Sequence, residues 1–323
     1  MKNRHIALIS ILLFLTVLTI TSCYKEDPIV PVSTEGADRF SFPQGNSPHD
    51  NVVNDVFTKF GVKIIYKDFR NEDFNLSWTA AAVGKEGYDI PEAEQSEATS
   101  FIANHIFGFL HPDITKRVLP PYFYVADSIF QMSSLAGGLL VSKQAQTYIY
   151  NGLDFWAFCW NGCQPWQDMM GNVTYLAITG KPSTPFEKFY RRGVMLKEIF
   201  KKAADLGNIG VPEDFSSGLD FTTAIKYATG TENDPNYFKK RGFPGQMISN
   251  TNFNITNLTS ITRTSPSQVF TDYIHLCMRY TADSIEVLYP KAKYPIIHQK
   301  YPIAIEYIKG KFGIDLVEIA TKP

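Results

Sequence analysis

The chain has 323 residues, of which 44% are hydrophobic and 20% charged, which is typical of a globular protein and excludes a disordered or multi-span membrane protein. Basic residues number 31 and acidic residues 32, so no excess of positive charge is available for a phosphate backbone. We therefore expect no nucleic-acid partner. Six histidines and four cysteines are too few for zinc-finger arrays or a disulfide-dense small domain.

The N-terminus has the pattern of a secretory signal. Lys2 and Arg4 precede an apolar run over residues 6–20, which is too short to span a bilayer as a mature helix. The run ends in Leu18-Thr19-Ile20-Thr21-Ser22-Cys23, which resembles the lipobox of bacterial lipoproteins. We predict that residues 1–22 are a signal peptide and that Cys23 is lipidated, so that acyl chains anchor the protein in membrane lipid. The alternative is a secreted protein in which Cys23 is unmodified.

Residues 23–47 are predicted to form a lipid-anchored tether, because prolines, serines and glycines interrupt a charged stretch. Tyr24-Lys25-Glu26-Asp27-Pro28 resembles the charged signal by which Bacteroidetes-type lipoproteins reach the outer face of the outer membrane. We therefore expect an outer-membrane protein at the cell surface. Removal of Lys2 and Arg4 with the signal leaves 29 basic and 32 acidic residues, a formal charge of −3.

From residue 48 onward, hydrophobic spacing, caps and breakers predict mixed elements first and helices later. In chain order we expect a helix over 48–60 ended by Gly61, a strand over 62–67, a helix over 91–110, a strand over 122–125 and strand formers over 139–150. There follow a helix over 184–206, loops and short helices over 207–265, helices over 266–288 and 294–312, and one further turn over 314–320. This order predicts one α+β domain over 48–323, with a small sheet in its N-terminal half packed on a mainly helical C-terminal half.

Several segments, taken in order, resemble the putative zinc-binding metallopeptidase lipoproteins found beside glycan-uptake systems in Bacteroidetes. They are Phe60-Gly61-Val62-Lys63-Ile64-Ile65-Tyr66-Lys67, Leu119-Pro120-Pro121-Tyr122-Phe123-Tyr124-Val125, Leu135-Ala136-Gly137-Gly138, Pro185-Phe186-Glu187-Lys188-Phe189, Arg241-Gly242-Phe243 and residues 307–316. The resemblance implies a zincin-like metallopeptidase scaffold, zinc as the cofactor, and a glycan or peptide uptake complex as partner.

The chain departs from that family at its zinc ligands. The family's active helix carries HExxH, in which two histidines bind zinc and the glutamate activates water. No histidine here is followed by glutamate, and the corresponding residues 169–177 contain no good zinc ligand. In the third-ligand segment, residues 265–272, only Asp272 is acidic. We therefore expect a family member that lacks the HExxH motif, with no metal and no catalytic residue.

Other local patterns give further candidates. His105 with His111, and His275 with Cys277, lack the spacing of a metal pair on one helical face. Cys159 and Cys163 are candidates for a disulfide in an oxidising compartment. Three of the four tryptophans fall within eleven residues and are candidate ligand-binding residues, because exposed rings stack on sugars or peptide side chains; alternatively they fill core volume. These tryptophans are Trp156, Trp160 and Trp166.

The sequence thus predicts a surface lipoprotein with a degenerate, inactive metallopeptidase-like fold that acts as a binding or accessory component in nutrient capture. The alternative is an active hydrolase that uses an unrecognised site, which requires converging carboxylates or a histidine near Asp272. A purely structural partner of an uptake complex is a third possibility, and it predicts an exposed apolar patch without a ligand pocket.

Overall fold

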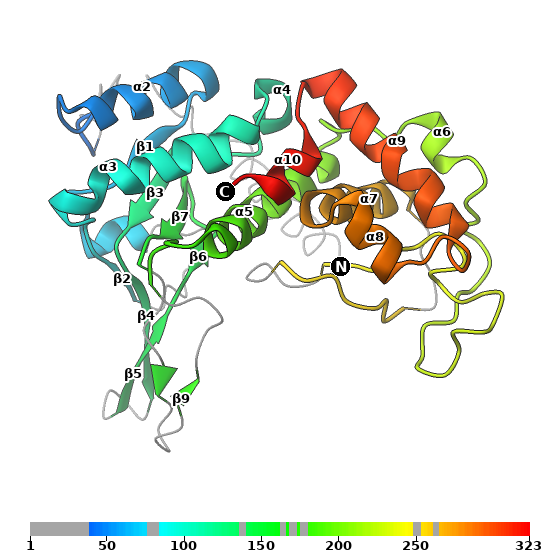
Figure 1. Cartoon of the computed structure of the whole chain (residues 1–323). Coiled ribbons are helices and arrows are strands. Elements are labelled where there is room, and N and C mark those ends of the chain that lie inside the picture. Colours follow the sequence, from blue (N-terminus) through cyan, green and yellow to red (C-terminus); the bar gives the residue numbers. More distant parts are fainter. Residues whose placement is uncertain are drawn as a thin grey trace, which may run out of the picture. The chain divides into compact units, whose positions relative to one another are not determined.

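The structure is a computed structural model that describes residues 39–75, 84–135, 140–161, 166–167, 173–174, 180–247, 253–260 and 265–323. The chain divides into the units Met1–Ser41 and Phe42–Pro323, and every helix and strand named below belongs to the second unit. The fold is mixed α+β, as predicted, with small sheets and many helices (Figure 1). The predicted signal peptide, Cys23 and most of the tether lie outside the described residues.

The main sheet has four strands in the order β1-β3-β7-β6. Strands β1 (Lys63–Ile65), β3 (Tyr122–Ala126) and β7 (Phe155–Cys159) are parallel, and β6 (Tyr148–Ile149) pairs antiparallel with β7 at the edge. All five residues of β7 are buried, as expected of a strand covered on both faces. A second, antiparallel sheet contains β2 (Lys85–Gly87), β4 (Ile129–Leu135) and β5 (Leu140–Ala145), and β8 (Trp166–Gln167) pairs with β9 (Val173–Thr174).

The helices follow the predicted order. They are α2 (Pro48–Phe60), η1 (Asn71–Phe74), α3 (Glu92–Phe101), η2 (Ile102–Ile106), η3 (Phe107–Phe109), α4 (Pro112–Thr115), α5 (Pro185–Asp205), α6 (Glu213–Ser216), α7 (Pro266–Arg279), α8 (Ala282–Leu288), α9 (Pro295–Phe312) and α10 (Leu316–Thr321). Within the described ranges, none of them has both the length and the hydropathy that a membrane span requires.

Two of the predicted helices are interrupted. The helix expected over 91–110 is α-helical only to Phe101 and continues as the π-helical η2 and the 3₁₀ turn η3. The helix expected over 266–288 breaks at Tyr280, whose backbone is extended at φ −128° and ψ 134°. Hydrophobic spacing alone did not reveal either break, because the apolar period continues across both of them.

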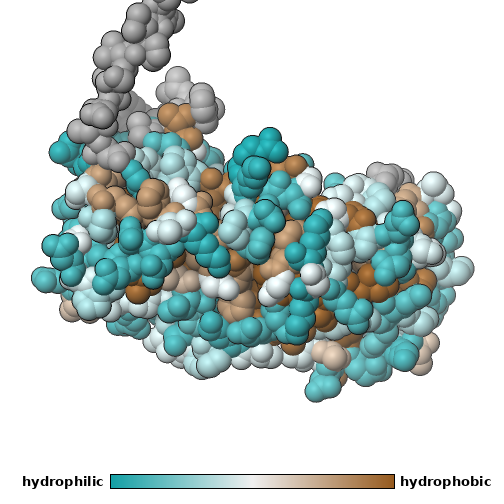
Figure 2. Space-filling view, turned by 90° about the horizontal axis from the view of Figure 1, so that it is seen from above, coloured by the Kyte–Doolittle hydropathy of each residue, from teal (hydrophilic) through white to brown (hydrophobic). Residues whose placement is uncertain are grey.

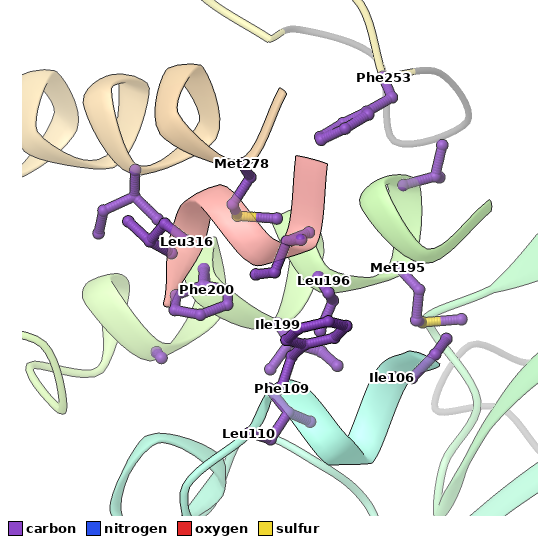
Figure 3. Packing of buried hydrophobic residues seen from close by; sticks show 14 of the residues in the cluster. Ile106, Phe109, Leu110, Met195, Leu196, Ile199, Phe200, Phe253, Met278 and Leu316 are labelled. Atoms are coloured by element: carbon purple, nitrogen blue, oxygen red, sulfur yellow. The ribbon is translucent and has the colours of Figure 1, made fainter. Parts of the chain in front are cut away.

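Helix α5 lies at the centre of the molecule's core. Thr184 caps it by accepting a hydrogen bond from the backbone of Glu187, whose carboxylate in turn accepts from the backbone of Thr184. The helix contacts α4, η2, α7 and α10. Its apolar side chains, among them Leu196, Ile199 and Phe200, lie between residues of η2 and η3 on one side and residues of α7 and α10 on the other (Figure 3).

Two adjacent arginines on α5 are fully buried and bind main-chain carbonyl groups. Arg191 donates from Nη1 to the carbonyl oxygens of Cys159 at 2.6 Å and Trp160 at 2.8 Å, and from Nη2 to Gly180. These bonds tie α5 to the carboxyl end of β7. Arg192 donates from Nε to the carbonyl oxygen of Ile319 at 2.8 Å and thereby satisfies the C-terminal end of α10.

Exposed large hydrophobic side chains among the described residues come from several elements. Figure 2 shows one face of the molecule, on which hydrophobic and hydrophilic residues are interspersed. Val287 and Leu288 on α8 are neighbours in sequence, and Phe186 begins α5. The full set is Phe57, Tyr88, Leu153, Phe186, Leu206, Val287 and Leu288. Single exposed apolar residues of this kind are common on protein surfaces.

Replacement of Arg191 by methionine should lower the free energy of unfolding by about 3–5 kcal/mol, because three carbonyl groups lose a charged donor in a buried site. Urea denaturation monitored by circular dichroism measures the change. Lys309→Met, at an exposed lysine of α9 that pairs with Asp315, is the control and should change stability little. Equal losses in the two variants would contradict the structural role of Arg191.

Candidate functional site

The tryptophans predicted to bind a ligand are core residues where the structure describes their side chains. Trp156 is 3% exposed and Trp160 is 1% exposed. The Trp156 ring packs edge-on against Tyr150 at a centroid distance of 5.0 Å. Trp160 Nε1 donates to Glu94 Oε2 at 2.8 Å. Neither ring forms the exposed stacking platform considered from the sequence, because Trp156 lies on the buried strand β7 and Trp160, directly after it, packs against Phe101. The Trp166 side chain lies outside the described residues.

The predicted disulfide stays a prediction, because Cys163 lies outside the described residues. Cys159 is fully buried at the end of β7, and its thiol donates to the carbonyl oxygen of Asp127 at 3.3 Å. Cys277 is buried on α7, and burial raises the pKa of its thiol well above the ordinary value. In an apolar environment such a thiol is unreactive.

The histidines of the described chain do not fit a zinc site. His49, His105, His111, His275 and His298 belong to five different segments. Among the described residues, no three side chains of histidine, cysteine, aspartate or glutamate converge to hold a metal ion. Within residues 169–177, where the family's active helix would lie, only Val173 and Thr174 are described, and they form strand β9. A tetrahedral zinc site needs at least three protein ligands, and this donor set does not supply them.

A polar pocket of about 160 Å³ lies between α5 and α7, and we call it the α5–α7 pocket. It contains Asp272, the acidic residue retained in the third-ligand segment, and His275 from the same helix. Asp272 and His275 are three residues apart, so they project from neighbouring positions on one helical face. The lining residues are Lys201, Asp205, Gln246, Met247, Gln268, Thr271, Asp272 and His275.

His275 is held as a neutral imidazole. Its Nε2 lies 3.1 Å from the carbonyl oxygen of Lys197, and since a carbonyl only accepts, Nε2 carries the proton. The Nδ1 atom is buried and has no hydrogen-bond partner within the described chain. Burial, assisted by the positive charges of Lys197 and Lys201, lowers the pKa of His275 to about 3. The ring is therefore a hydrogen-bonding group at neutral pH and a weak base.

Lys197 is a second buried polar group on α5. The side chain is 1% exposed, and its Nζ lies 3.7 Å from Glu198 Oε1. Burial lowers the pKa of Lys197 to about 8, and the nearby carboxylate of Glu198 opposes that change. The ammonium group thus remains mostly charged at neutral pH and contributes to the positive field that disfavours protonation of His275.

The charges around the α5–α7 pocket favour a ligand that donates hydrogen bonds. Lys201 Nζ forms an ion pair with Asp205 Oδ2 at 2.7 Å, so their charges largely cancel. Asp272 is 9% exposed and His275 is neutral, so the lining adds a carboxylate and an uncharged imidazole to this ion pair. Neutral or cationic small molecules match this lining better than anions.

From the sequence, Asp272 was noted as the acidic residue that the third-ligand segment retains. His275 was considered only together with Cys277, and that pair was rejected as metal ligands. The signal that would have identified the pair is their spacing of three residues on a predicted helix. The pocket itself could not be recognised, because Lys201 and Asp205 come from a helix that lies more than sixty residues earlier in the chain.

Comparisons with known proteins add a weak likeness. No family model matches the chain, and no curated protein matches it. One similar solved structure is a putative zinc-binding metallo-peptidase from Bacteroides caccae, with 15% sequence identity and a TM-score of 0.39, covering 86% of this chain and 92% of that one. At this level of similarity the match carries no argument about the fold or activity of this chain.

Lowering the pH should decrease the free energy of unfolding, because His275 is neutral in the folded protein. The pKa of His275 in the fold is about 3, below the ordinary 6.5, so between these pH values the unfolded chain binds a proton that the folded chain does not. The stability contributed by the neutral ring is complete above pH 6.5 and is lost as the pH falls towards 3. From pH 7 to pH 5 the loss is about 2 kcal/mol.

His275→Gln cannot titrate, so its free energy of unfolding should fall less between pH 7 and pH 5 than that of the wild type, by about 2 kcal/mol. Urea unfolding at the two pH values measures the difference. The same decrease in both proteins would show that His275 does not have its low pKa in the fold.

Proposed function

We propose that this chain is an outer-membrane lipoprotein, anchored at the cell surface through Cys23, that binds a small ligand as an accessory component of nutrient capture. In this proposal the chain has a degenerate metallopeptidase-like scaffold and does not cleave peptides. Its protein partner is a glycan or peptide uptake complex.

The observation that carries the proposal is the state of His275 in the α5–α7 pocket. The only histidine that shares a described pocket with Asp272 has its Nε2–H bound to the main chain and a pKa of about 3. A general base works best with a pKa near the operating pH, and this ring lies several units below it. The side chains of the pocket are therefore suited to hydrogen bonding and not to proton transfer.

The sequence supports the same conclusion from a second direction. No histidine is followed by glutamate anywhere in the chain, so the zinc ligands and the base of an HExxH site are missing together. The third-ligand segment, residues 265–272, keeps only Asp272 as an acidic residue, and this loss at a second position reinforces the loss of HExxH.

An active hydrolase is the second candidate, and one observation favours it. A histidine near Asp272 was the feature that this alternative required, and His275 lines the same pocket as Asp272. Binding of substrate would then have to raise the pKa of His275 by several units and release its Nε2 from the carbonyl group of Lys197.

Metal analysis and a peptidase assay on the same preparation separate the two candidates. Full-length lipoprotein purified in detergent without chelators should contain far less than one zinc per chain and should show no hydrolysis of a casein substrate. Hydrolysis without zinc that disappears in both Asp272→Asn and His275→Gln would establish the hydrolase instead. Stoichiometric zinc with peptidase activity would overturn the proposal altogether.

The anchor is tested by metabolic labelling with radioactive palmitate and by fractionation of the membranes. Cys23→Ala should incorporate no label and should not undergo lipoprotein processing, because the acyl acceptor is absent. Cys163→Ser, which removes a cysteine outside the lipobox, is the matched control and should be labelled like the wild type. Label retained in Cys23→Ala would refute lipidation at this position.

A further inference from the structure

The turn that follows α3 is π-helical and carries His105. Ile102–Ile106 forms this turn, whereas the α-helix before it ends at Phe101. Such turns are rare and often occur at functional sites. The imidazole ring of His105 stacks on the Phe101 ring, with centroids 4.9 Å apart and planes 16° apart. One face of the His105 ring is therefore fixed by the helix that precedes it.

Arg192 fixes the tautomer of His105. Its Nη1 lies 3.1 Å from His105 Nδ1, and a guanidinium group can only donate hydrogen bonds. Nδ1 therefore accepts, and the proton of the neutral ring is on Nε2. Within the described chain, Nε2 has no hydrogen-bond partner, so His105 presents an unused N–H donor.

The positive charge of Arg192 is buried and lacks an ion-pair partner among the described residues. Its hydrogen bonds go to His105 and to the carbonyl oxygens of Ile319 and Lys322, and none goes to a carboxylate. The carboxylate of Glu318 favours the charged form of Arg192, but burial outweighs it and lowers the pKa of Arg192 to about 10, so the buried charge is only partly compensated. Burial and the cations Arg192, Lys322 and Lys188 all lower the pKa of His105, which shows that the field at this ring is positive.

His105 opens onto a pocket of about 180 Å³, which we call the α3–α5 pocket. The space corresponds to roughly six water molecules, enough for one small organic ligand. Lys188 on α5 also lines it and forms no ion pair among the described residues, whereas Glu97 is paired with Lys181 Nζ at 3.0 Å. The lining residues are Glu97, Ser100, Phe101, Asn104, His105, Trp160, Pro182 and Lys188.

We infer that the α3–α5 pocket binds the carboxylate group of a small acidic ligand, to which His105 Nε2–H and Lys188 Nζ donate hydrogen bonds. The bound carboxylate adds to the partial counter-charge of Glu318, and His105 transmits the interaction because Arg192 donates to its other nitrogen. Two sources share this chemistry: a uronic acid, and the C-terminal carboxylate of a short peptide.

This site is independent of the α5–α7 pocket. Lys188 and Lys201 are thirteen residues apart on α5, which places them about 20 Å apart along the helix. The two pockets also differ in charge, because the α5–α7 pocket holds the carboxylate of Asp272 beside an ion pair, whereas the α3–α5 pocket holds Lys188, which forms no ion pair among the described residues. If experiments showed that the α5–α7 pocket is catalytic and not a binding site, carboxylate binding at His105 would still be expected.

Isothermal titration of the full-length lipoprotein in detergent tests the inference with two matched pairs of probes. D-glucuronate is compared with D-glucose, and N-acetylglycine with N-acetylglycinamide. At least one carboxylate should bind saturably and at least about tenfold more tightly than its neutral counterpart, and the tighter of the two identifies the source. No saturable binding of either carboxylate, or equal affinity for the neutral counterpart, would overturn the inference.

Variants locate the site. Lys188→Met should weaken carboxylate binding about 10- to 100-fold, whereas Lys309→Met, an equal charge change on α9, should leave it unchanged. In ¹⁵N-histidine-labelled protein the bound carboxylate should shift the Nε2–H resonance of His105, which is assigned by its absence in His105→Phe. Wild-type affinity in Lys188→Met, or an unshifted His105 resonance at saturation, would contradict the assignment.

Discussion

The structure depends on two adjacent, buried arginines of α5 that bind different parts of the fold. Arg191 binds the carbonyl groups at the carboxyl end of β7, and Arg192 binds those at the end of α10. Main-chain carbonyls at the ends of strands and helices need donors, and a guanidinium supplies several from one fixed group. Through this pair a single helix connects the main sheet of the N-terminal half to the last helix of the chain. Among the described residues Arg192 forms no ion pair, and burial of its charge is only partly offset by Glu318, which supports the carboxylate site proposed for the α3–α5 pocket.

The sequence predicted the elements whose ends have local chemical signals. Thr184 with Glu187 begins α5, and Gly61 and Gly313 end α2 and α9 with positive φ values of 70° and 68°. It did not predict the burial of Arg191 and Arg192, because a pair of arginines within an amphipathic helix normally faces solvent. Their partners are distant in the sequence: Ile319 is 127 residues from Arg192. Contacts between residues so far apart in the sequence leave no pattern in the local spacing of residues. The α5–α7 pocket could not be predicted for the same reason.

The two buried or half-buried histidines show how the same side chain can leave opposite hydrogen-bonding groups unused. Each is kept neutral by burial and by neighbouring cations, but His275 uses its N–H internally on the carbonyl group of Lys197, whereas His105 uses its lone pair internally on Arg192. The internal partner therefore decides whether the remaining nitrogen accepts or donates. Neither ring has the second histidine four residues away, or the following glutamate, with which the resembled family builds its zinc site.

Both histidines are engaged in hydrogen bonds, and we propose that neither binds zinc. Anomalous diffraction at the zinc absorption edge, from crystals of the protein grown with zinc, tests it most directly, because it locates every bound zinc ion and its ligands. The account predicts that no anomalous peak is coordinated by three protein side chains, with His105 still on Arg192 and His275 still on Lys197. A zinc ion held by three protein ligands, with either histidine among them, would contradict the account.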